Sequence, residues 1–368
     1  MSMIQEILKK NNLLEQFLHD YSDSPKPVIL YGAGNSIMYF INILNKYNVP
    51  ITAIVDKSQS FTSERYIEGI RIYPVEYLNN PTEEAYVIIS ALSHRKEIYE
   101  IIKKISDKYL IHCFDPSLEI IQKVDHKTRK DFYINNESKF ESIASLFADD
   151  FSVQSYSKVL EGAFTNDSDC YSEIGSDSQY FPDFIRKILT PSEIFVDLGA
   201  YIGDSILDFI KINNNEFKKA YAFEPKEENM LIAKRIITDP RVEFCLYGIG
   251  SKTETLYLHG SSGADDDAYL SADPENAIDK IDIVSIDDYI NGPISFVKMD
   301  IEGMELDALK GAKESIIKYH PKLAISIYHK LDDFLTIPQY IFSLDNTYKL
   351  YLRHYWNSCG TDTVLFAI

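Results

Sequence analysis

The sequence predicts an α/β protein with two parallel sheets, each flanked by helices. Apolar runs at 28–31 and 194–196 each lead into a glycine-containing turn and then a segment with apolar residues at helical spacing. From residue 194 onward, strand-like and helix-like segments alternate, which is typical of a parallel sheet with crossover helices. At 368 residues, the chain is long enough for two domains.

Composition and charge narrow the class of protein. The residues are 45% hydrophobic and 25% charged, as in ordinary globular proteins, and the formal net charge is −19. This charge argues against a nucleic-acid partner, since a general phosphate-backbone binder needs clustered Lys and Arg. The four separated cysteines favour a reducing compartment over a zinc site or a disulfide scaffold.

The N-terminus lacks a signal peptide's apolar core, and no apolar run approaches the ~18 residues needed to span a bilayer. We therefore expect a cytoplasmic protein without a membrane partner. Its 26 Tyr and 20 Phe residues leave enough aromatic surface for a homo-oligomer.

Residues 1–118 are predicted to form a small Rossmann-like domain. A strand at 28–31 leads into Gly32-Ala-Gly34 and a helix, and a second strand at 51–55 ends in Asp56. This is the outline of a dinucleotide-binding unit. Because the third glycine of that motif is missing, we favour a domain that packs, orients partners or dimerises over one that holds a nucleotide or a sugar.

Residues 119–178 carry no sheet pattern and are predicted to form a helical connector. We expect this connector also to act as a lid over the ligand cleft of the next domain, which spans 179–368. The aromatic stretch 179–182 fits a part of that lid and packing at a domain junction equally well. Farther on, the polar segment Gly260–Asp267 is predicted to be a solvated loop.

The segment from Ile194 to Ser205 is predicted to be a strand, a glycine loop and a helix. Gly199 and Gly203 allow the backbone to pass close to a ligand. The carboxylates of Asp197 and Asp204 argue against a phosphate ligand, which a helix N-terminus would otherwise favour. An acid at the strand end suits a ligand with a cationic amine and ribose hydroxyls, and S-adenosylmethionine (SAM) has both.

Two further acidic strand ends follow. Glu224 closes the next strand, where its carboxylate can accept both ribose hydroxyls of an adenosine, and Pro225 stops further pairing. The strand from Ile294 delivers Lys298, Asp300 and Glu302 near its carboxyl end, where ligands bind in open α/β sheets. Charged residues there are hard to explain as core, because unpaired buried charges are costly.

The second half of the chain resembles FkbM family SAM-dependent methyltransferases. The resemblance covers about residues 179–368 and rests on VDLGAYIGDS, AFEP, Ser-Ile-Asp-Asp at 285–288, and KMDIEGMELDALKGA followed by Pro321. It implies a seven-stranded methyltransferase sheet with helices on both faces and its last strand antiparallel. It also implies methylation mostly of hydroxyl groups, on sugars, polysaccharides and natural products. The N-terminal half looks like the Rossmann-like modules attached to some sugar-modifying enzymes.

The resemblance also assigns roles to residues of this sequence. It implies a SAM-binding set made of Asp197, Gly199, Ala200, Tyr201, Gly203, Asp204, Ser205, Glu224, Pro225 and Gly248. Glu224 would hold the ribose, and Gly248 would pass near the adenine. Asp300 and Glu302 would lie at the methyl-transfer end.

Transfer to a hydroxyl needs in-line positioning and a group that takes the proton. Asp300 and His329, at adjacent strand ends, are our candidates for this base. A divalent cation held by Asp300, Glu302 and His329 is the competing account. We do not favour it, because the two carboxylates share a side only while the strand persists and Lys298 would oppose a cation. The alternative for His329 is a structural role, and for Lys298 it is pairing with Asp300 or Glu302.

The leading hypothesis is a SAM-dependent O-methyltransferase that acts on a sugar, a glycan precursor or a related small molecule. The same site could accept an amine, which leaves N-methylation of an amino sugar open. One alternative is an NAD- or nucleotide-sugar-binding enzyme centred on Gly32–Asp56. Another is a SAM-binding scaffold without turnover.

Overall fold

The computed structural model describes the chain in six stretches: 1–59, 64–79, 81–176, 178–259, 269–271 and 273–368. The predicted loop Gly260–Asp267 lies outside them. The chain divides into two compact units. The first unit comprises Met1–Ser145, Val153–Ser176 and His354–Thr361, and the second comprises Leu146–Ser152, Asp177–Arg353 and Asp362–Ile368. Among the described residues, no helix combines the length and apolar character that a membrane span requires.

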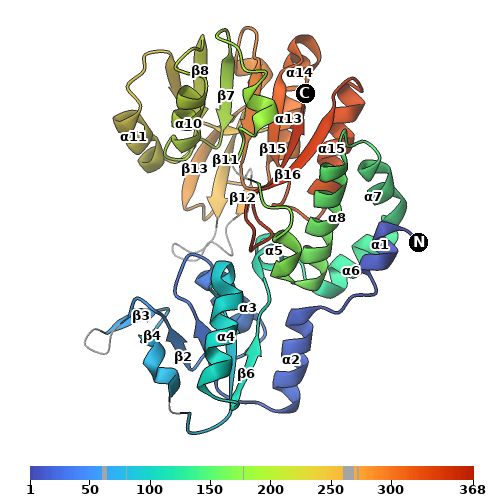
Figure 1. The fold of residues 1–368 in the computed structure, drawn as a ribbon. Helices are drawn as coiled ribbons and strands as arrows, with labels where there is room; N and C mark the ends of the chain where they lie inside the picture. The colour runs from blue at the N-terminus through green and yellow to red at the C-terminus, as the bar shows by residue number, and fades with distance from the viewer. Residues whose placement is uncertain (60–63, 80, 177, 260–268, 272) are drawn as a thin grey trace. The chain divides into compact units, whose positions relative to one another are not determined.

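A six-stranded sheet forms the centre of the first unit, in the order β3-β4-β2-β1-β5-β6 (Figure 1). The strands are β1 (Val28–Tyr31), β2 (Ala53–Val55), β3 (Arg65–Ile67), β4 (Ile70–Tyr73), β5 (Ala85–Ile89) and β6 (Tyr109–His112). All neighbouring pairs are parallel except β3 and β4.

Alternate residues of β1 enter two different cores. Val28 and Leu30 belong to a cluster with apolar residues of α2 (Leu13–Asp23) and α3 (Ile37–Lys46). Ile29 and Tyr31 belong to a cluster with residues of α4 (Arg95–Ile105). Since successive strand residues point to opposite faces, helices cover both faces of this sheet. The prediction of an N-terminal Rossmann-like α/β domain is thus confirmed.

The predicted connector consists of helices in its described part. The helices of this region are α5 (Ser117–Ile121), α6 (His126–Asn135), α7 (Glu137–Ala144) and α8 (Asp150–Thr165). A further short helix of the first unit, α1 (Met3–Ile7), lies at the start of the chain. Residues 119–145 and 153–176 group with the first unit. The lid role and the three-part division into 1–118, 119–178 and 179–368 stay predictions.

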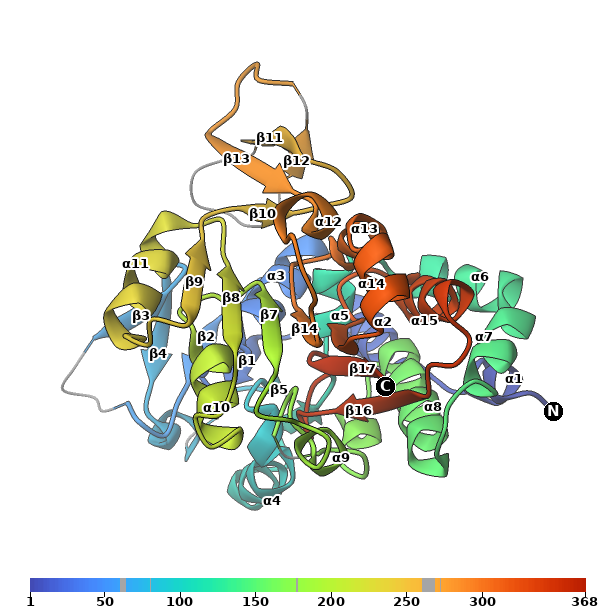
Figure 2. The same ribbon diagram turned by 90° about the horizontal axis from the view of Figure 1, so that it is seen from above.

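The second unit contains the expected seven-stranded sheet, in the order β16-β17-β15-β14-β7-β8-β9 (Figure 2). Its strands are β7 (Ile194–Leu198), β8 (Lys219–Phe223), β9 (Val242–Cys245), β14 (Phe296–Met299), β15 (Lys322–Ser326), β16 (Leu350–His354) and β17 (Thr363–Ala367). In this sheet β9, β8, β7, β14 and β15 pair in parallel, each with the next, and β17 is antiparallel to β15. A four-stranded sheet, β10-β13-β11-β12, lies in the same unit. It is built from β10 (Gly248–Ile249), β11 (Glu254–His259), β12 (Tyr269–Ser271) and β13 (Asp279–Val284).

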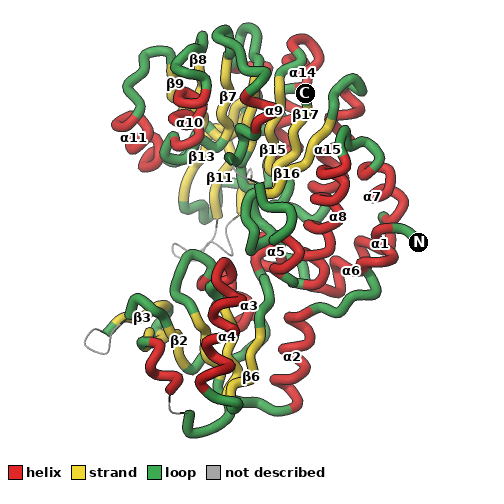
Figure 3. The backbone as a smooth tube through the Cα atoms, viewed as in Figure 1, coloured by secondary structure: helices red, strands yellow, loops and turns green. Residues whose placement is uncertain are grey.

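Helices lie on both faces of the seven-stranded sheet (Figures 2 and 3). They are α9 (Asp183–Arg186), α10 (Asp204–Ile212), α11 (Glu227–Ile236), α12 (Ile286–Tyr289), α13 (Glu305–Gly311), α14 (Lys313–Tyr319) and α15 (Asp333–Leu344). On one face, Phe209 of α10 stacks on Phe195 of β7 with 4.4 Å between ring centroids. On the other, α13, α14 and α15 pack on one another. The central strands are therefore buried on both sides, which explains their continuous apolar runs.

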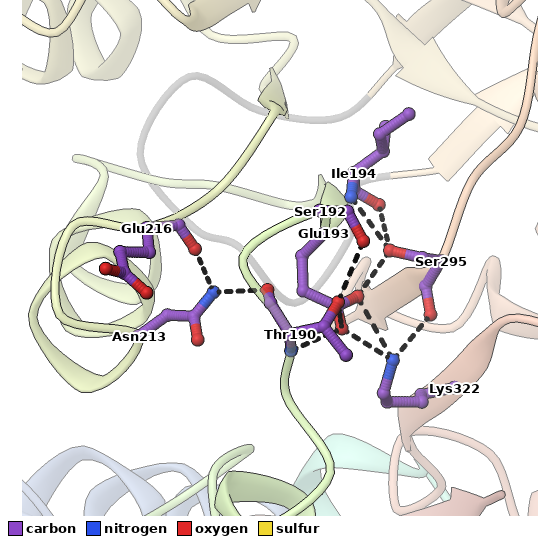
Figure 4. Close-up of polar contacts among 8 residues, drawn as sticks. All are labelled: Thr190, Ser192, Glu193, Ile194, Asn213, Glu216, Ser295 and Lys322. Carbon is purple, nitrogen blue, oxygen red and sulfur yellow. Dashed lines mark hydrogen bonds and ion pairs between the residues drawn. The ribbon is translucent and has the colours of Figure 1, made fainter.

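Three strands are joined at their amino ends by a buried ion pair (Figure 4). Glu193, which is 1% exposed, lies 2.9 Å from the Lys322 ammonium and also accepts hydrogen bonds from Ser295 and Thr190. Glu193 and Ser295 directly precede β7 and β14, and Lys322 begins β15, so the cluster lies at the edge of the sheet opposite the carboxyl ends. Its role is structural.

We expect Glu193→Gln to lower the free energy of unfolding by about 3 kcal/mol, because it leaves a half-buried ammonium without its charge partner. Burial raises the pKa of Glu193, but Ser295 and Lys322 outweigh it and bring the pKa below the usual value. The stabilisation is therefore complete above the usual Glu pKa and is lost as the pH falls through the lowered one. Urea unfolding at pH 7 and pH 3 measures both effects. Glu216→Gln, an exposed residue in the same view, is the control and should change nothing.

Candidate functional site

The candidate site lies where the order of the seven-stranded sheet reverses. Strand β7 has β8 on one side and β14 on the other. After β7 the chain adds β8 and β9 on one side, and later adds β14 and β15 on the opposite side. Crevices at the carboxyl ends of strands beside such a point are where ligands bind in open α/β sheets. The loops after β7, β8 and β14 carry most of the residues that the sequence singled out.

The conformation of the glycine loop after β7 requires a glycine at position 199. Its φ is +81°, and a Cβ added there would lie 1.9 Å from the carbonyl oxygen of Asp300. The N–H groups of Gly199 and Ala200 both donate to the carbonyl of Phe223, at 3.0 and 2.9 Å, which joins the loop to β8. Gly203, with φ of +88°, is the N-cap residue of α10. The loop thus touches the ends of both neighbouring strands.

Asp197 and Lys298 form a buried ion pair beneath this loop. Asp197 Oδ1 lies 3.0 Å from Lys298 Nζ, and their side chains are 0% and 4% exposed. Lys298 also donates to the carbonyl of Gly199 at 2.7 Å, and the Ser205 hydroxyl donates to the other carboxylate oxygen of Asp197. Burial lowers the pKa of Lys298, but Asp197 and Asp300 outweigh it and raise the pKa above its usual value. The pair therefore holds the loop in place from below.

The Glu224 carboxylate lies beside the loop, at the end of β8. It is 7% exposed, and it accepts hydrogen bonds from the N–H groups of Tyr201 and Lys226 at 3.1 and 3.0 Å. Asn229, in the first turns of α11, donates to it as well, at 3.1 Å. The carboxylate is thus fixed on both sides, while Pro225 beside it and Tyr201 across from it are exposed. An arrangement of this kind can receive a pair of vicinal hydroxyls.

Acidic side chains gather around His329 at the ends of β14 and β15. Its Nδ1 lies 2.9 Å from Glu305 Oε1, and its Nε2 lies 3.5 Å from Asp300 Oδ1 and 3.6 Å from Glu302 Oε2. The side chains of His329 and Glu305 are buried, whereas that of Glu302 is 92% exposed. Burial lowers the pKa of His329, but the three carboxylates outweigh it and raise the pKa to about 9.

Known proteins resemble both halves of the chain. The model of the methyltransferase FkbM domain matches residues 197–350. The crystal structure of methyltransferase FkbM from Methylobacillus flagellatus KT covers 100% of this chain and 94% of its own, with 25% identity and a TM-score of 0.74. Residues 197–350 form an FkbM methyltransferase domain. Residues 24–112 match a second family model, C2185-like, N-terminal.

Other solved methyltransferases share less with this chain. A putative rRNA methylase from Clostridium thermocellum covers 50% of it and 90% of its own chain, with 11% identity and a TM-score of 0.35. A putative methyltransferase from Streptococcus mutans in complex with SAH covers 50% and 93%, with 16% identity and a TM-score of 0.33. Among curated proteins, no relative matches the chain.

Within the FkbM domain, Gly248 lies apart from the loops just described. It starts β10 of the smaller sheet, opposite Ile283 of β13. A Cβ on Gly248 would come within 2.5 Å of the Ile283 side chain. Close packing therefore accounts for this glycine without a ligand, and a contact with adenine stays a prediction.

Three residues of the second unit contact the predicted site residues although the sequence analysis did not assign them to the site. The hydroxyl of Tyr180, from the aromatic stretch 179–182, donates to Asp300 Oδ2 at 2.7 Å. Glu305, the first residue of α13, contacts His329, and Asn229 contacts Glu224. The spacing Glu302-x-x-Glu305 at a predicted helix start was the one available signal for Glu305.

The acid of the N-terminal Rossmann-like domain is held by its own loop. One oxygen of Asp56 accepts the N–H of Ala33 at 2.7 Å, and the other accepts the N–H and the hydroxyl of Ser58 at 2.8 and 2.5 Å. Gly32, with φ of +118°, packs against Ala91. These contacts explain the glycine and the acid by the fold of the loop.

Proposed function

We propose that this protein uses SAM to methylate a hydroxyl of a sugar, a glycan precursor or a related small molecule. The observation that carries the proposal is the Glu224 carboxylate, fixed by two backbone N–H groups beside the glycine loop at the reversal of strand order. Charged hydrogen bonds from the two ribose hydroxyls of SAM to this carboxylate would orient the cofactor along the loop. The FkbM family supports methyl transfer as the reaction.

The charge distribution of the site supports a cationic cofactor. Asp300, Glu302 and Glu305 follow β14 within six residues, and they place negative charge where the sulfonium of SAM would lie. Holding the acceptor in line with the methyl group supplies ~7 kcal/mol or more, and a positioned base adds about 10²–10⁴-fold. Asp300, whose side chain is 24% exposed and oriented by Tyr180, is the base we propose.

The family and the overall charge support the proposed acceptor class. A net charge of −19 favours a small-molecule or glycan substrate over a nucleic acid. The separated cysteines favour a cytoplasmic location. An amine on an amino sugar is the alternative acceptor at the same site.

Calorimetric titration of SAM, S-adenosylhomocysteine and NAD⁺ into the full-length protein tests the proposal. We expect SAM to bind and Glu224→Gln to weaken it about 10- to 100-fold, because one or two charged hydrogen bonds become neutral or are lost. Glu224→Ala should remove measurable binding. Glu228→Gln changes an exposed carboxylate in the first turn of α11, and this variant should bind SAM as the wild type does. Binding of NAD⁺ without SAM would overturn the proposal and point to the N-terminal domain.

A further inference from the structure

Asp300, Glu305 and His329 each place a potential ligand atom in the same small region. One atom from each lies within 4.8 Å of the other two. Asp300 follows β14, Glu305 opens α13, and His329 follows β15. Since β14 and β15 are neighbouring parallel strands, the sheet itself sets the separation of these groups. This is the rigid support that a metal site requires.

Several polar atoms of this group lack hydrogen bonds although they are buried. Neither ring nitrogen of His329 has a hydrogen-bond partner among the described residues, and the same holds for Asp300 Oδ1 and Glu305 Oε2. His329 is 6% exposed and Glu305 is fully buried. Because buried polar atoms are nearly always satisfied in native proteins, such a concentration indicates an additional ligand.

The closest contact in the group also fits two ligands of one cation. His329 Nδ1 and Glu305 Oε1 form an ion pair 2.9 Å apart. Two ligand atoms at right angles, each about 2.1 Å from a metal, are separated by about 3 Å. The spacing is thus the one expected between adjacent coordination positions.

Negative charge is in excess here. Three carboxylates, those of Asp300, Glu302 and Glu305, surround one imidazole. The sequence suggested that Lys298 would oppose a cation at this place, but the Lys298 ammonium is engaged by Asp197 and Gly199. Glu305 is fully buried and Asp300 is partly buried, whereas Glu302 is exposed, so Glu305 and Asp300 are the carboxylates whose charge a cation would compensate.

We propose that Asp300, Glu305 and His329 bind one divalent cation. Two carboxylate oxygens and one imidazole nitrogen suit Mn²⁺ or Zn²⁺ better than Ca²⁺, which takes six to eight oxygens. The cation site considered from the sequence contained Glu302 and not Glu305. In the proposed site Glu305 replaces Glu302, because the backbone turns out of the strand direction at Glu302, with φ of 55°.

The cation would activate the acceptor hydroxyl, and this role rests on the proposed methyl transfer. An acceptor hydroxyl at an open coordination position would have a lower pKa and lose its proton more easily. With the cation bound, Asp300 would serve as its ligand and not as the base, and the proton would pass to the exposed carboxylate of Glu302 or to water. The oxygen then bonds to the methyl carbon as the carbon–sulfur bond breaks, and S-adenosylhomocysteine leaves with the electron pair.

Mn²⁺ binding to chelator-treated full-length protein tests the site without any need for turnover. We expect the electron paramagnetic resonance signal of free Mn²⁺ to show one bound ion per chain. Spin-echo modulation should detect a nitrogen nucleus coupled to that ion. Asp300→Asn and Glu305→Gln should weaken binding at least about tenfold, and His329→Gln should also remove the nitrogen coupling. Asp307→Asn, a carboxylate two residues after Glu305 on α13, is the matched control and should bind as the wild type does.

Several results would contradict the proposed cation site. Wild-type binding weaker than about 1 mM, or equal binding by Asp300→Asn and wild type, would overturn the cation site. Asp300→Asn decides the matter if the variants of the buried residues fail to fold, since Asp300 is partly exposed. SAM binding in the presence of a chelator, without Mn²⁺ binding, would reject the cation and leave the proposed function standing. Mn²⁺ binding without SAM binding would support the cation site and reject the proposed function.

Discussion

Gly199→Ala is expected to abolish SAM binding and to lower the free energy of unfolding by about 3 kcal/mol. The new methyl group would lie 1.9 Å from the carbonyl oxygen of Asp300, and the backbone at φ of +81° already disfavours a side chain. The left-handed conformation costs roughly 1–2 kcal/mol, and the forced backbone shift costs roughly 1–3 kcal/mol more. Because that shift moves the loop away from Asp300, it changes both ends of the proposed cofactor site.

Calorimetry with SAM and urea unfolding check this prediction. Gly34→Ala is the matched control, since Gly34 belongs to the glycine turn of the other domain and a Cβ there would contact nothing within 4 Å. That variant should keep wild-type stability and SAM affinity. Wild-type SAM affinity in Gly199→Ala would show that the loop after β7 does not hold the cofactor.

The second large effect is expected for Lys298→Met. This change leaves the fully buried carboxylate of Asp197 without its cation, and breaking a buried pair in this way costs about 3–5 kcal/mol. Replacing both partners, as in Asp197→Asn with Lys298→Met, should recover most of that loss, because no uncompensated charge is left. Both variants should still bind SAM poorly, since the Gly199 carbonyl loses its hydrogen bond from Lys298.

The pH dependence of the Lys298→Met variant follows from the same pair. Burial raises the pKa of Asp197 even in the wild type. Without Lys298 the pKa rises further, so the carboxyl group has a higher pKa in the folded than in the unfolded protein. The stability deficit is therefore full above the folded pKa and shrinks as the pH falls toward the unfolded one.

Thermal and urea unfolding between pH 5 and pH 8 measure the deficit. Lys310→Met, which removes an exposed pair with Asp307, should cost less than about 1 kcal/mol and serves as the control. A loss below about 1 kcal/mol for Lys298→Met, or a double variant no more stable than the single one, would contradict the account of the buried pair.

The local elements of the FkbM domain were predictable because they follow from neighbouring residues. The apolar run before Asp197, the glycines at 199 and 203, and the helical spacing after them specify a strand, a turn and a helix. Glu224 was identified in the same way, as an acid that ends a strand. Sequence motifs also identified the family, which the match to residues 197–350 confirms.

The partners of the charged residues could not be predicted in this way. We expected Lys298 to pair with Asp300 or Glu302, its neighbours in the sequence, but it pairs with Asp197. Glu305 was not among the predicted site residues, yet it is buried against His329. Both errors come from judging contacts by sequence distance.

The sequence by itself determined the elements, the glycine loop, the acids at the strand ends and the family. Tertiary structure decided which charges meet. Strand β14 lies beside β7 with Lys298 in register with Asp197, and β15 lies beside β14, which brings His329 to Asp300 and Glu305. Hydrophobic periodicity indicates whether a residue faces a core. Strand order and register depend on how the whole sheet packs, so they cannot be predicted from a short stretch of sequence.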